Sequence, residues 1–145
     1  MENNMITIQA TINAPIEKVW EFWNKPEHIT GWAFASDTWE APHAENDLRT
    51  GGKFMTRMQE KGTGNGFDFG GIYTNVVEHK TIEYDMAKAP NEADSRHVKI
   101  VFETTPDGVK ITQSFDPENE NTIEMQRTGW QTILDNFKKY AEENK

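Results

Sequence analysis

Apolar and polar residues alternate along residues 5–12, near the start of the chain. Every second side chain in this segment is apolar, which is the period of a strand with one buried face. The apolar positions are Ile6, Ile8, Ala10 and Ile12. The pattern therefore predicts a first strand that turns one face toward a core and the other toward solvent.

Beyond this strand the apolar spacing changes to three and four residues, which is typical of an amphipathic helix. Asn13 offers a capping side chain and Pro15 suits a first helical turn. The apolar positions that follow are Ile16, Val19, Trp20 and Trp23. A second short helical stretch begins after Pro26 and carries Ile29 and Trp32. The sequence thus predicts two short helices directly after the first strand.

An antiparallel meander of four or more strands is predicted over residues 51–115, because apolar and polar residues alternate there between turn signals. The predicted strand segments are 54–58, 67–77, 81–87, 98–102 and 109–115. The glycine-rich residues 62–66 form one hairpin tip, and the Thr-Pro-Asp-Gly sequence of residues 105–108 forms a tight turn. Residues 36–47 mix turn residues with Trp39 and predict no element.

A long helix ends the chain, since apolar residues recur there at helical intervals. This stripe consists of Ile123, Trp130, Ile133, Leu134, Phe137 and Ala141. No repeat or linker divides the sequence, so residues 1–145 are predicted to form a single domain. The order of elements indicates an α+β fold. A curved sheet covered by one helix leaves space between them, and small-molecule sites of about 300–1,000 Å³ typically occupy such concavities.

Charge and cysteine content narrow the classes of partner. The formal net charge of -9 repels phosphate backbones and anionic headgroups, so neither nucleic acid nor a membrane surface is an expected partner. No run approaches the ~18 apolar residues of a membrane helix, and the first four residues lack the features of a signal peptide, so we expect a cytoplasmic protein. The sequence contains no cysteine, which excludes disulfide and thiolate chemistry.

Four spaced motifs resemble a known family. They are Ile-Asn-Ala-Pro-Ile-Glu-Lys-Val-Trp from Ile12, Pro26-Glu27-His28, Asp47-Leu48-Arg49-Thr50-Gly51-Gly52-Lys53-Phe54, and Gly129-Trp130. Together they resemble the single-domain proteins similar to the activator of Hsp90 ATPase, within the START-like, Bet v 1-like superfamily of helix-grip folds. The resemblance implies a seven-stranded antiparallel sheet curved around the C-terminal helix. It also implies a cavity for lipids, aromatic polyketide-like molecules or other apolar ligands.

These motifs have physical interpretations that concern folding rather than chemistry. Gly51 and Gly52 allow a tight turn into the following strand. Gly129 either brings the last helix close to a neighbour or leaves space beside Trp130. Arg49 fits either a pair with an acidic residue near the cavity mouth or a surface ion pair of little energetic consequence, and the second is favoured.

The strand phases predict a set of side chains that point toward the C-terminal helix. This set, together with Leu134 of the helix, is the candidate ligand-binding site: Phe54, Met58, Phe69, Tyr73, Tyr84, Met86, Phe102, Gln113, Phe115, Trp130 and Leu134. The same residues also suit an ordinary filled core. Methionine is flexible and tyrosine adds a polar group, so both line adaptable pockets well. Gln113 stands out because a buried amide must find a partner, either a ligand oxygen or a neighbouring side chain.

Other chemistry finds little support in the sequence. The histidines His28, His43, His79 and His97 lack metal-ligand spacing. The glycines of residues 62–66 lack the Lys-Ser/Thr ending of a phosphate-binding loop, and no serine lies in a Gly-x-Ser-x-Gly elbow. We therefore expect no metal, no cofactor and no catalytic nucleophile.

Three functions remain open. The first is non-catalytic binding of an apolar small molecule, lipid-like or aromatic. The second is a cyclase or hydratase, which needs an acid or base in the cavity; His97, Asp85 and Glu103 are candidates by proximity, although alternation turns Asp85 and Glu103 outward. The third, implied by the resemblance alone, is interaction with an Hsp90-type chaperone.

Overall fold

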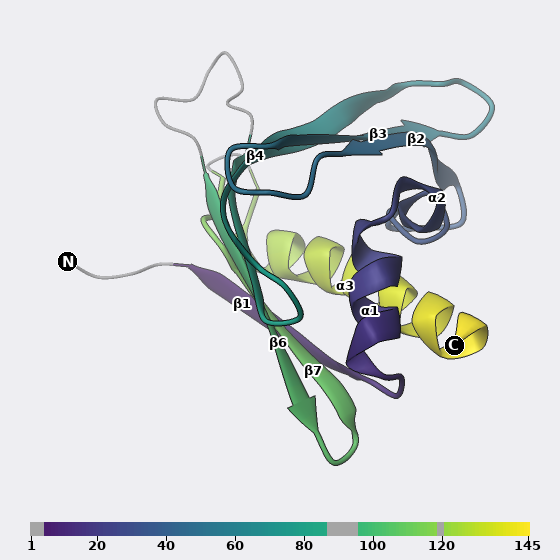
Figure 1. Ribbon diagram of the computed structural model, residues 1–145. Helices are drawn as coiled ribbons and strands as arrows, with labels where there is room; N and C mark the ends of the chain where they lie inside the picture. Colours follow the sequence, from purple (N-terminus) through teal and green to yellow (C-terminus); the bar gives the residue numbers. More distant parts are fainter. Residues whose placement is uncertain (1–4, 87–95, 119–120) are drawn as a thin grey trace.

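A computed structural model describes residues 5–86, 96–118 and 121–145, which form one curved antiparallel sheet and three helices. The seven strands follow the spatial order β1-β7-β6-β5-β4-β3-β2. The elements are β1 (Ile6–Ile12), α1 (Ile16–Asn24), α2 (Pro26–Ile29), β2 (Trp39–Asn46), β3 (Lys53–Glu60), β4 (Gly66–Val77), β5 (Thr81–Met86), β6 (His97–Thr105), β7 (Gly108–Phe115) and α3 (Ile123–Asn144). The sheet curves around α3, and α1 and α2 lie on the same concave side (Figure 1). The predicted helix-grip α+β fold is confirmed.

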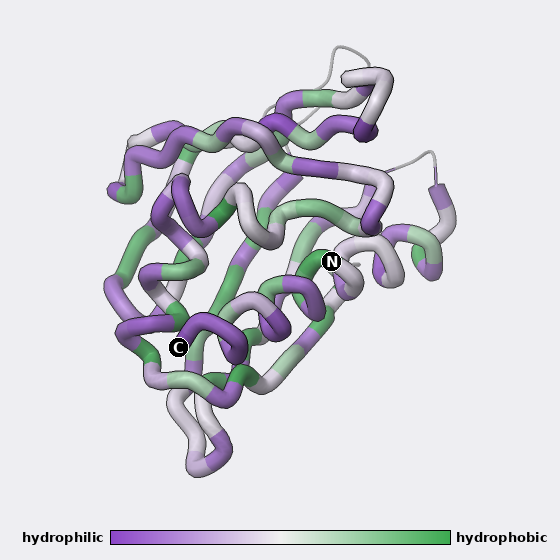
Figure 2. The backbone as a smooth tube through the Cα atoms, turned by 90° about the vertical axis from the view of Figure 1, so that its right-hand side faces the viewer, coloured by the Kyte–Doolittle hydropathy of each residue, from purple (hydrophilic) through white to green (hydrophobic). Residues whose placement is uncertain are grey.

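The meander follows the predicted strand phases. Along β7 the burial alternates at every residue, and the buried positions are Val109, Ile111, Gln113 and Phe115. β1 pairs with β7 with Ile6 opposite Phe115, so the first and last strands of the chain lie side by side. The predicted strand 81–87 is β5, with Ala87 outside the described residues. Strongly hydrophobic stretches follow the strands and helices, whereas the hairpin tips are hydrophilic or neutral (Figure 2).

The entry into α1 differs from the prediction. Pro15, rather than Asn13, occupies the N-cap, and no side chain caps the helix. Asn13 lies two residues before the N-cap, too far from the first free N–H groups of the helix. Its own backbone N–H instead donates to Glu142 Oε2 at 2.9 Å. This bond ties the β1–α1 connection to the C-terminal end of α3.

Residues 36–47, for which the sequence predicted no element, contain the edge strand β2. The register between β2 and β3 shifts between Glu40 and His43, at a position occupied by Pro42. Proline cannot donate a ladder hydrogen bond, so it occurs in sheets at edges and irregularities. The shift interrupts the alternation on which a strand prediction depends.

The apolar stripe of α3 begins later than predicted. The side chain of Ile123, in the first turn, is 44% exposed, and the first buried residue of the helix is instead Gln126. The Gln126 carboxamide accepts from Glu118 N at 2.8 Å and donates to Asn121 O at 2.9 Å. Because these bonds tie the loop after β7 to the helix, a polar residue occupies a buried site that the hydrophobic period could not identify.

The glycines of the family motifs serve different purposes. Gly51 has a φ of +88°, and a Cβ on Gly52 would come within 2.0 Å of the Asp47 carbonyl oxygen, so the tight turn requires both. Gly129 instead faces open space, so of the two alternatives left open by the sequence the structure supports space beside the helix and not a close approach. Arg49 pairs with Asp47 at 3.0 Å in an exposed ion pair, as predicted.

Candidate functional site: a cavity between the sheet and the C-terminal helix

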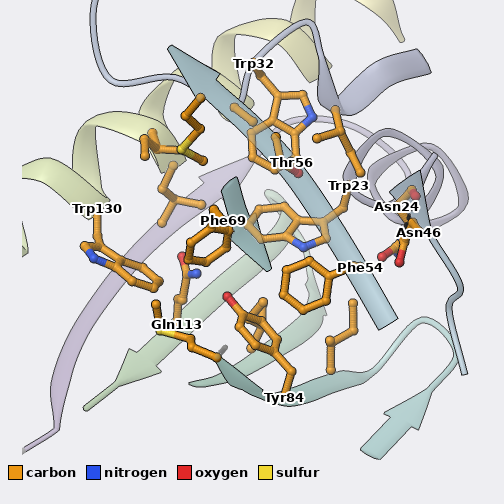
Figure 3. Close-up of a pocket in the computed structure, with 18 of the residues that line it drawn as sticks. Trp23, Asn24, Trp32, Asn46, Phe54, Thr56, Phe69, Tyr84, Gln113 and Trp130 are labelled. Carbon is orange, nitrogen blue, oxygen red and sulfur yellow. Dashed lines mark hydrogen bonds between the residues drawn. The ribbon is translucent and has the colours of Figure 1, made fainter. Parts of the chain in front are cut away.

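A cavity of about 290 Å³ lies between the concave face of the sheet and α3. Most of the residues predicted to bind a ligand line it: Phe54, Met58, Phe69, Tyr73, Tyr84, Met86, Gln113, Trp130 and Leu134. They come from β3, β4, β5, β7 and α3, because each inward strand position faces the helix. Figure 3 shows several of these side chains directed toward one another across the cavity.

Phe102 and Phe115, the remaining predicted residues, do not line the cavity. The Phe102 ring packs against Trp20 and Trp23, with ring centroids 5.2 and 5.8 Å apart. The Phe115 ring stacks on Trp130 at 3.9 Å and 11°. Both rings point inward as alternation predicts, but neighbouring aromatic side chains separate them from the cavity.

The helices, β2, the connecting segments and further positions on β3 to β6 contribute lining residues that the candidate set omitted. The additional residues are Trp23, Asn24, Ile29, Trp32, Ala33, Glu45, Asn46, Thr56, Phe67, Ile82, Arg96, Ile100, Glu118 and Ile133. Trp23 and Trp32 lie on the apolar faces of the predicted helices, and this was the only sequence signal for them. Hydrophobic periodicity identifies apolar faces, so it gave no signal for Asn24 at the end of α1 or for Glu45 and Asn46 on a segment without a predicted element.

Polar groups on the α1 side of the cavity bond to one another. Asn46 Nδ2 donates to the Asn24 carbonyl oxygen at 2.6 Å, and the Tyr73 hydroxyl donates to Asn46 Oδ1 at 2.5 Å. Asn24 Nδ2 donates to the carbonyl oxygen of Trp20 at 2.9 Å. Burial raises the pKa of Tyr73 well above its usual range, so its hydroxyl stays a donor. This network joins α1, β2 and β4 at one wall of the cavity.

Gln113 and Tyr84 differ from this network. Their residues are only 6% and 5% exposed, and both line the cavity. Among the described residues, neither the Gln113 carboxamide nor the Tyr84 hydroxyl has a protein hydrogen-bond partner. Burial also raises the pKa of Tyr84 far above its usual range, so the hydroxyl remains protonated. Of the two partners that the sequence left open for Gln113, the structure therefore offers no neighbouring side chain.

Three charged residues reach the cavity lining, namely Arg96, Glu45 and Glu118. Glu118 Oε1 accepts from the Asn121 side chain at 2.7 Å, and Glu45 Oε2 lies 2.7 Å from His43 Nε2. Both carboxylates therefore have polar partners outside the cavity lining. The positive charge of Arg96 acts on Tyr84, where it partly opposes the rise in pKa that burial causes.

The acid and base candidates from the sequence do not reach the cavity. His97 lies between two carboxylates of β5, with Nδ1 2.8 Å from Asp85 Oδ1 and Nε2 3.1 Å from Glu83 Oε1. Desolvation opposes a charged imidazole, but the two carboxylates outweigh it and raise the pKa of His97. Neither these residues nor Glu103 line the cavity.

Neither a metal-ion site nor a membrane-spanning helix is found among the described residues. In the part of the chain that the structure describes, no group of three or more histidine, aspartate or glutamate side chains is arranged to hold a metal ion. No described helix combines the length and the apolar character needed to cross a membrane.

A curved antiparallel sheet that grips a long C-terminal helix, with a cavity between them, defines a helix-grip domain of the START-like, Bet v 1-like class. Within this class, the family model for "Activator of Hsp90 ATPase homolog 1-like protein" matches residues 13–142. The chain belongs to that family.

Solved structures agree with this assignment. An AHSA1-like protein from Aeromonas hydrophila is 38% identical, with a TM-score of 0.86 over 96% of this chain and 92% of that one. A protein from Cytophaga hutchinsonii is 47% identical, with a TM-score of 0.79 over 98% of this chain and 94% of that one. A protein from Chromobacterium violaceum, 20% identical with a TM-score of 0.84 over 96% of this chain and 97% of that one, shares the fold. No curated protein matches the chain.

Proposed function

We propose that this domain binds an apolar small molecule, lipid-like or aromatic, in the cavity between the sheet and α3, without catalysing a reaction. The observation that carries the proposal is the pair of buried polar side chains, Gln113 and Tyr84, that face the cavity without a protein partner among the described residues. Leaving a buried polar group unbonded costs about 1–3 kcal/mol. A bound ligand that carries a polar oxygen would remove this cost.

The size and the lining of the cavity support the same proposal. Its volume of about 290 Å³ suits a compact ligand of one or two rings or a medium-length chain. Burying about 250 Å² of apolar ligand surface contributes about 6 kcal/mol at about 25 cal/mol per Å². After the costs of association, we expect dissociation constants of about 1–100 μM. Met58 and Met86 can adjust to ligands of different outline.

The experiment that tests this proposal replaces a cavity-lining side chain with a larger one that occupies the space of the ligand. Phe54, Thr56 and Met58 of β3 line the cavity, whereas Met55 lies between them and points to the opposite face of the sheet. We would titrate wild type, Met58→Trp and the control Met55→Trp with fatty acids, sterols, flavonoid-like and polyketide-like compounds in a calorimeter.

We expect saturable binding of at least one class to wild type and to Met55→Trp, and a loss of tenfold or more in Met58→Trp. Binding that both tryptophan variants retain would place the ligand elsewhere on the protein. A complete failure of the panel to bind wild type would contradict the proposal.

The family supports a second candidate, interaction with an Hsp90-type chaperone, because the description of the matching family names the activator of Hsp90 ATPase. If this candidate holds, adding the protein to purified Hsp90 should raise its rate of ATP hydrolysis. This candidate would be contradicted if a tenfold excess of the domain left the rate of ATP hydrolysis unchanged and the domain did not co-sediment with Hsp90.

A further inference from the structure

We propose that the ligand carries two neutral hydrogen-bonding groups, one at each end of an apolar body, of which one bonds to Gln113 of β7 and the other to Thr56 of β3. This inference rests on the proposed function and names the chemical class of molecule that the same cavity accepts. Both residues line the cavity and are only 6% exposed. A ligand with a single polar end satisfies only one of the two side chains.

The Thr56 hydroxyl is a further buried polar group that has no protein hydrogen-bond partner in the part of the chain that the structure describes. It retains some accessible surface, as does the Gln113 carboxamide. Because both residues are almost fully covered by protein and line one cavity, this surface faces the cavity. A hydroxyl and a carboxamide can each donate and accept. Each side chain therefore suits a hydroxyl or a carbonyl group of a ligand.

Gln113 and Thr56 lie on well-separated parts of the sheet. Three strands, β6, β5 and β4, lie between β7 and β3, which corresponds to about 19 Å along the sheet at about 4.8 Å from strand to strand. Figure 3 shows the two side chains at different positions around the cavity, Gln113 at the lower left and Thr56 near the top. One polar group of a ligand therefore cannot bond to both.

The curvature of the sheet brings these two parts close enough for one small ligand to span them. Phe69 of β4 pairs with Thr56, and Phe115 lies two residues from Gln113 on the same inward face of β7. Both phenylalanine rings contact the indole of Trp130, with centroids 6.0 and 3.9 Å from it. Because one aromatic side chain reaches both walls, an apolar body of one or two rings, or a chain of similar length, can do the same.

A second polar group distinguishes this site from a purely apolar cavity. A ligand hydroxyl that is buried without a partner weakens binding by about tenfold or more. A hydroxyl that bonds to Thr56 instead strengthens binding, because the threonine hydroxyl is otherwise unbonded among the described residues. Adding a hydroxyl to the far end of an apolar alcohol therefore has opposite effects in the two cases.

The test uses matched pairs of an alcohol and a diol with one hydroxyl at each end. The pairs are octanol with octanediol, decanol with decanediol, and naphthol with a dihydroxynaphthalene. Each compound is titrated calorimetrically into wild type, Thr56→Val, Gln113→Leu and the control Thr112→Val. Thr112 lies next to Gln113 on β7 but does not line the cavity. Valine has nearly the shape of threonine, so this change removes a hydroxyl without opening space.

We expect wild type and Thr112→Val to bind at least one diol about threefold or more tightly than the matching alcohol. Thr56→Val and Gln113→Leu should each weaken the binding of that diol by about fivefold or more, because each leaves one ligand hydroxyl without a partner. The alcohol has a single hydroxyl. Its affinity should therefore fall in only one of these two variants and stay within about twofold in the other.

The outcomes separate this inference from the proposed function. Wild type that binds every alcohol as tightly as its diol, or more tightly, would overturn the two-ended ligand and leave a cavity for apolar molecules. Unchanged affinity for the diol in Thr56→Val or Gln113→Leu would overturn the role of that residue. Failure of all six compounds to bind wild type would also overturn the inference, and the proposed function falls only if the fatty acids, sterols and aromatic compounds fail as well.

Discussion

The two ends of the space between the sheet and α3 contain similar aromatic side chains, yet only one end is filled. At the filled end, the ring of Phe137 in the C-terminal half of α3 packs against Trp23 and Trp32, with centroids 4.8 and 4.9 Å apart. These two indoles also line the cavity, whereas Phe137 does not, so they form the boundary between the two ends. At the hollow end, Trp130 and Leu134 in the middle of α3 line the cavity.

The difference follows from what covers the sheet. At the filled end α1 inserts a second layer, and Trp20 covers Phe102 of β6. At the hollow end the rings pack edge to face as a wall, as in Phe54 against Tyr84 at 4.7 Å and Phe69 against Trp130 at 6.0 Å. Aromatic content alone therefore does not distinguish a core from a cavity. The difference depends on whether a helix such as α1 packs over the aromatic side chains of the sheet.

The largest expected contrast compares one phenylalanine from each end. Phe137→Ala should lower the free energy of unfolding by about 3–5 kcal/mol, because the ring is fully buried and leaves a new void. Phe69→Ala should lower it by less than half as much, since one side of that ring already faces the cavity. Urea denaturation of the two variants measures both values, and equal losses would contradict the distinction between the ends.

The second contrast compares two glutamines with the same 6% exposure. Gln126→Leu removes three hydrogen bonds to the loop before α3 and should cost about 1–3 kcal/mol of stability. Gln113→Leu removes an amide without a described protein partner, so it should leave stability unchanged or raise it by up to about 1 kcal/mol. A large loss in Gln113→Leu would show that the amide is bonded within the protein.

The third contrast uses two glycines. A Cβ at Gly31 would lie 2.5 Å from the Tyr140 ring, near the C-terminal end of α3, whereas a Cβ at Gly129 would meet open space. We expect Gly31→Ala to lower stability by about 1 kcal/mol. Gly129→Ala should raise it by up to about 1 kcal/mol, because alanine is the better helix former. Thermal unfolding of both variants checks this, and a destabilised Gly129→Ala would contradict the open space beside Trp130.

The smallest effect is expected on the outer face, at His97. The raised pKa of His97 means that its charged form stabilises the fold fully below its ordinary value of 6.5, and that this contribution is lost as pH rises through the folded value. The hydrogen bonds from Asn75 and His97 lower the pKa of Glu83 below 4.5, so its own contribution is lost as pH falls through that lower value.

His97→Gln should therefore lose less than about 1 kcal/mol relative to wild type, since solvent screens the pair. The loss should be largest between about pH 4.5 and 6.5 and should shrink at higher pH. Denaturant titrations at several pH values measure it. Ligand affinity should not change, and a tenfold change would contradict the placement of His97 outside the cavity.

The sequence predicted the inward face of each regular element, because that information is local. Alternation identified Phe54, Phe69, Tyr84 and Gln113. It could not distinguish Phe102 from Tyr84, which lie on neighbouring strands with the same phase, because Trp20 and Trp23 cover the first and not the second. That difference depends on the position of α1, which is far from β6 in the sequence.

The remaining lining residues escaped prediction for two physical reasons. Asn24 is held by a hydrogen bond to the Trp20 carbonyl oxygen, and hydrophobic patterns do not report such bonds. Asn46 belongs to β2, whose alternation is interrupted by the register shift around Pro42. Arg96 lies between the predicted strand segments 81–87 and 98–102, so the sequence assigned it no strand phase.

The most direct test of the account is a two-dimensional amide NMR titration of the labelled protein with the panel of apolar compounds. The account predicts saturable shifts at the hollow end, around Phe69, Tyr84, Gln113 and Trp130, with the amide of Phe137 at the filled end unchanged. Shifts confined to the filled end or to the outer face, or no shifts with any compound, would contradict a ligand-binding cavity.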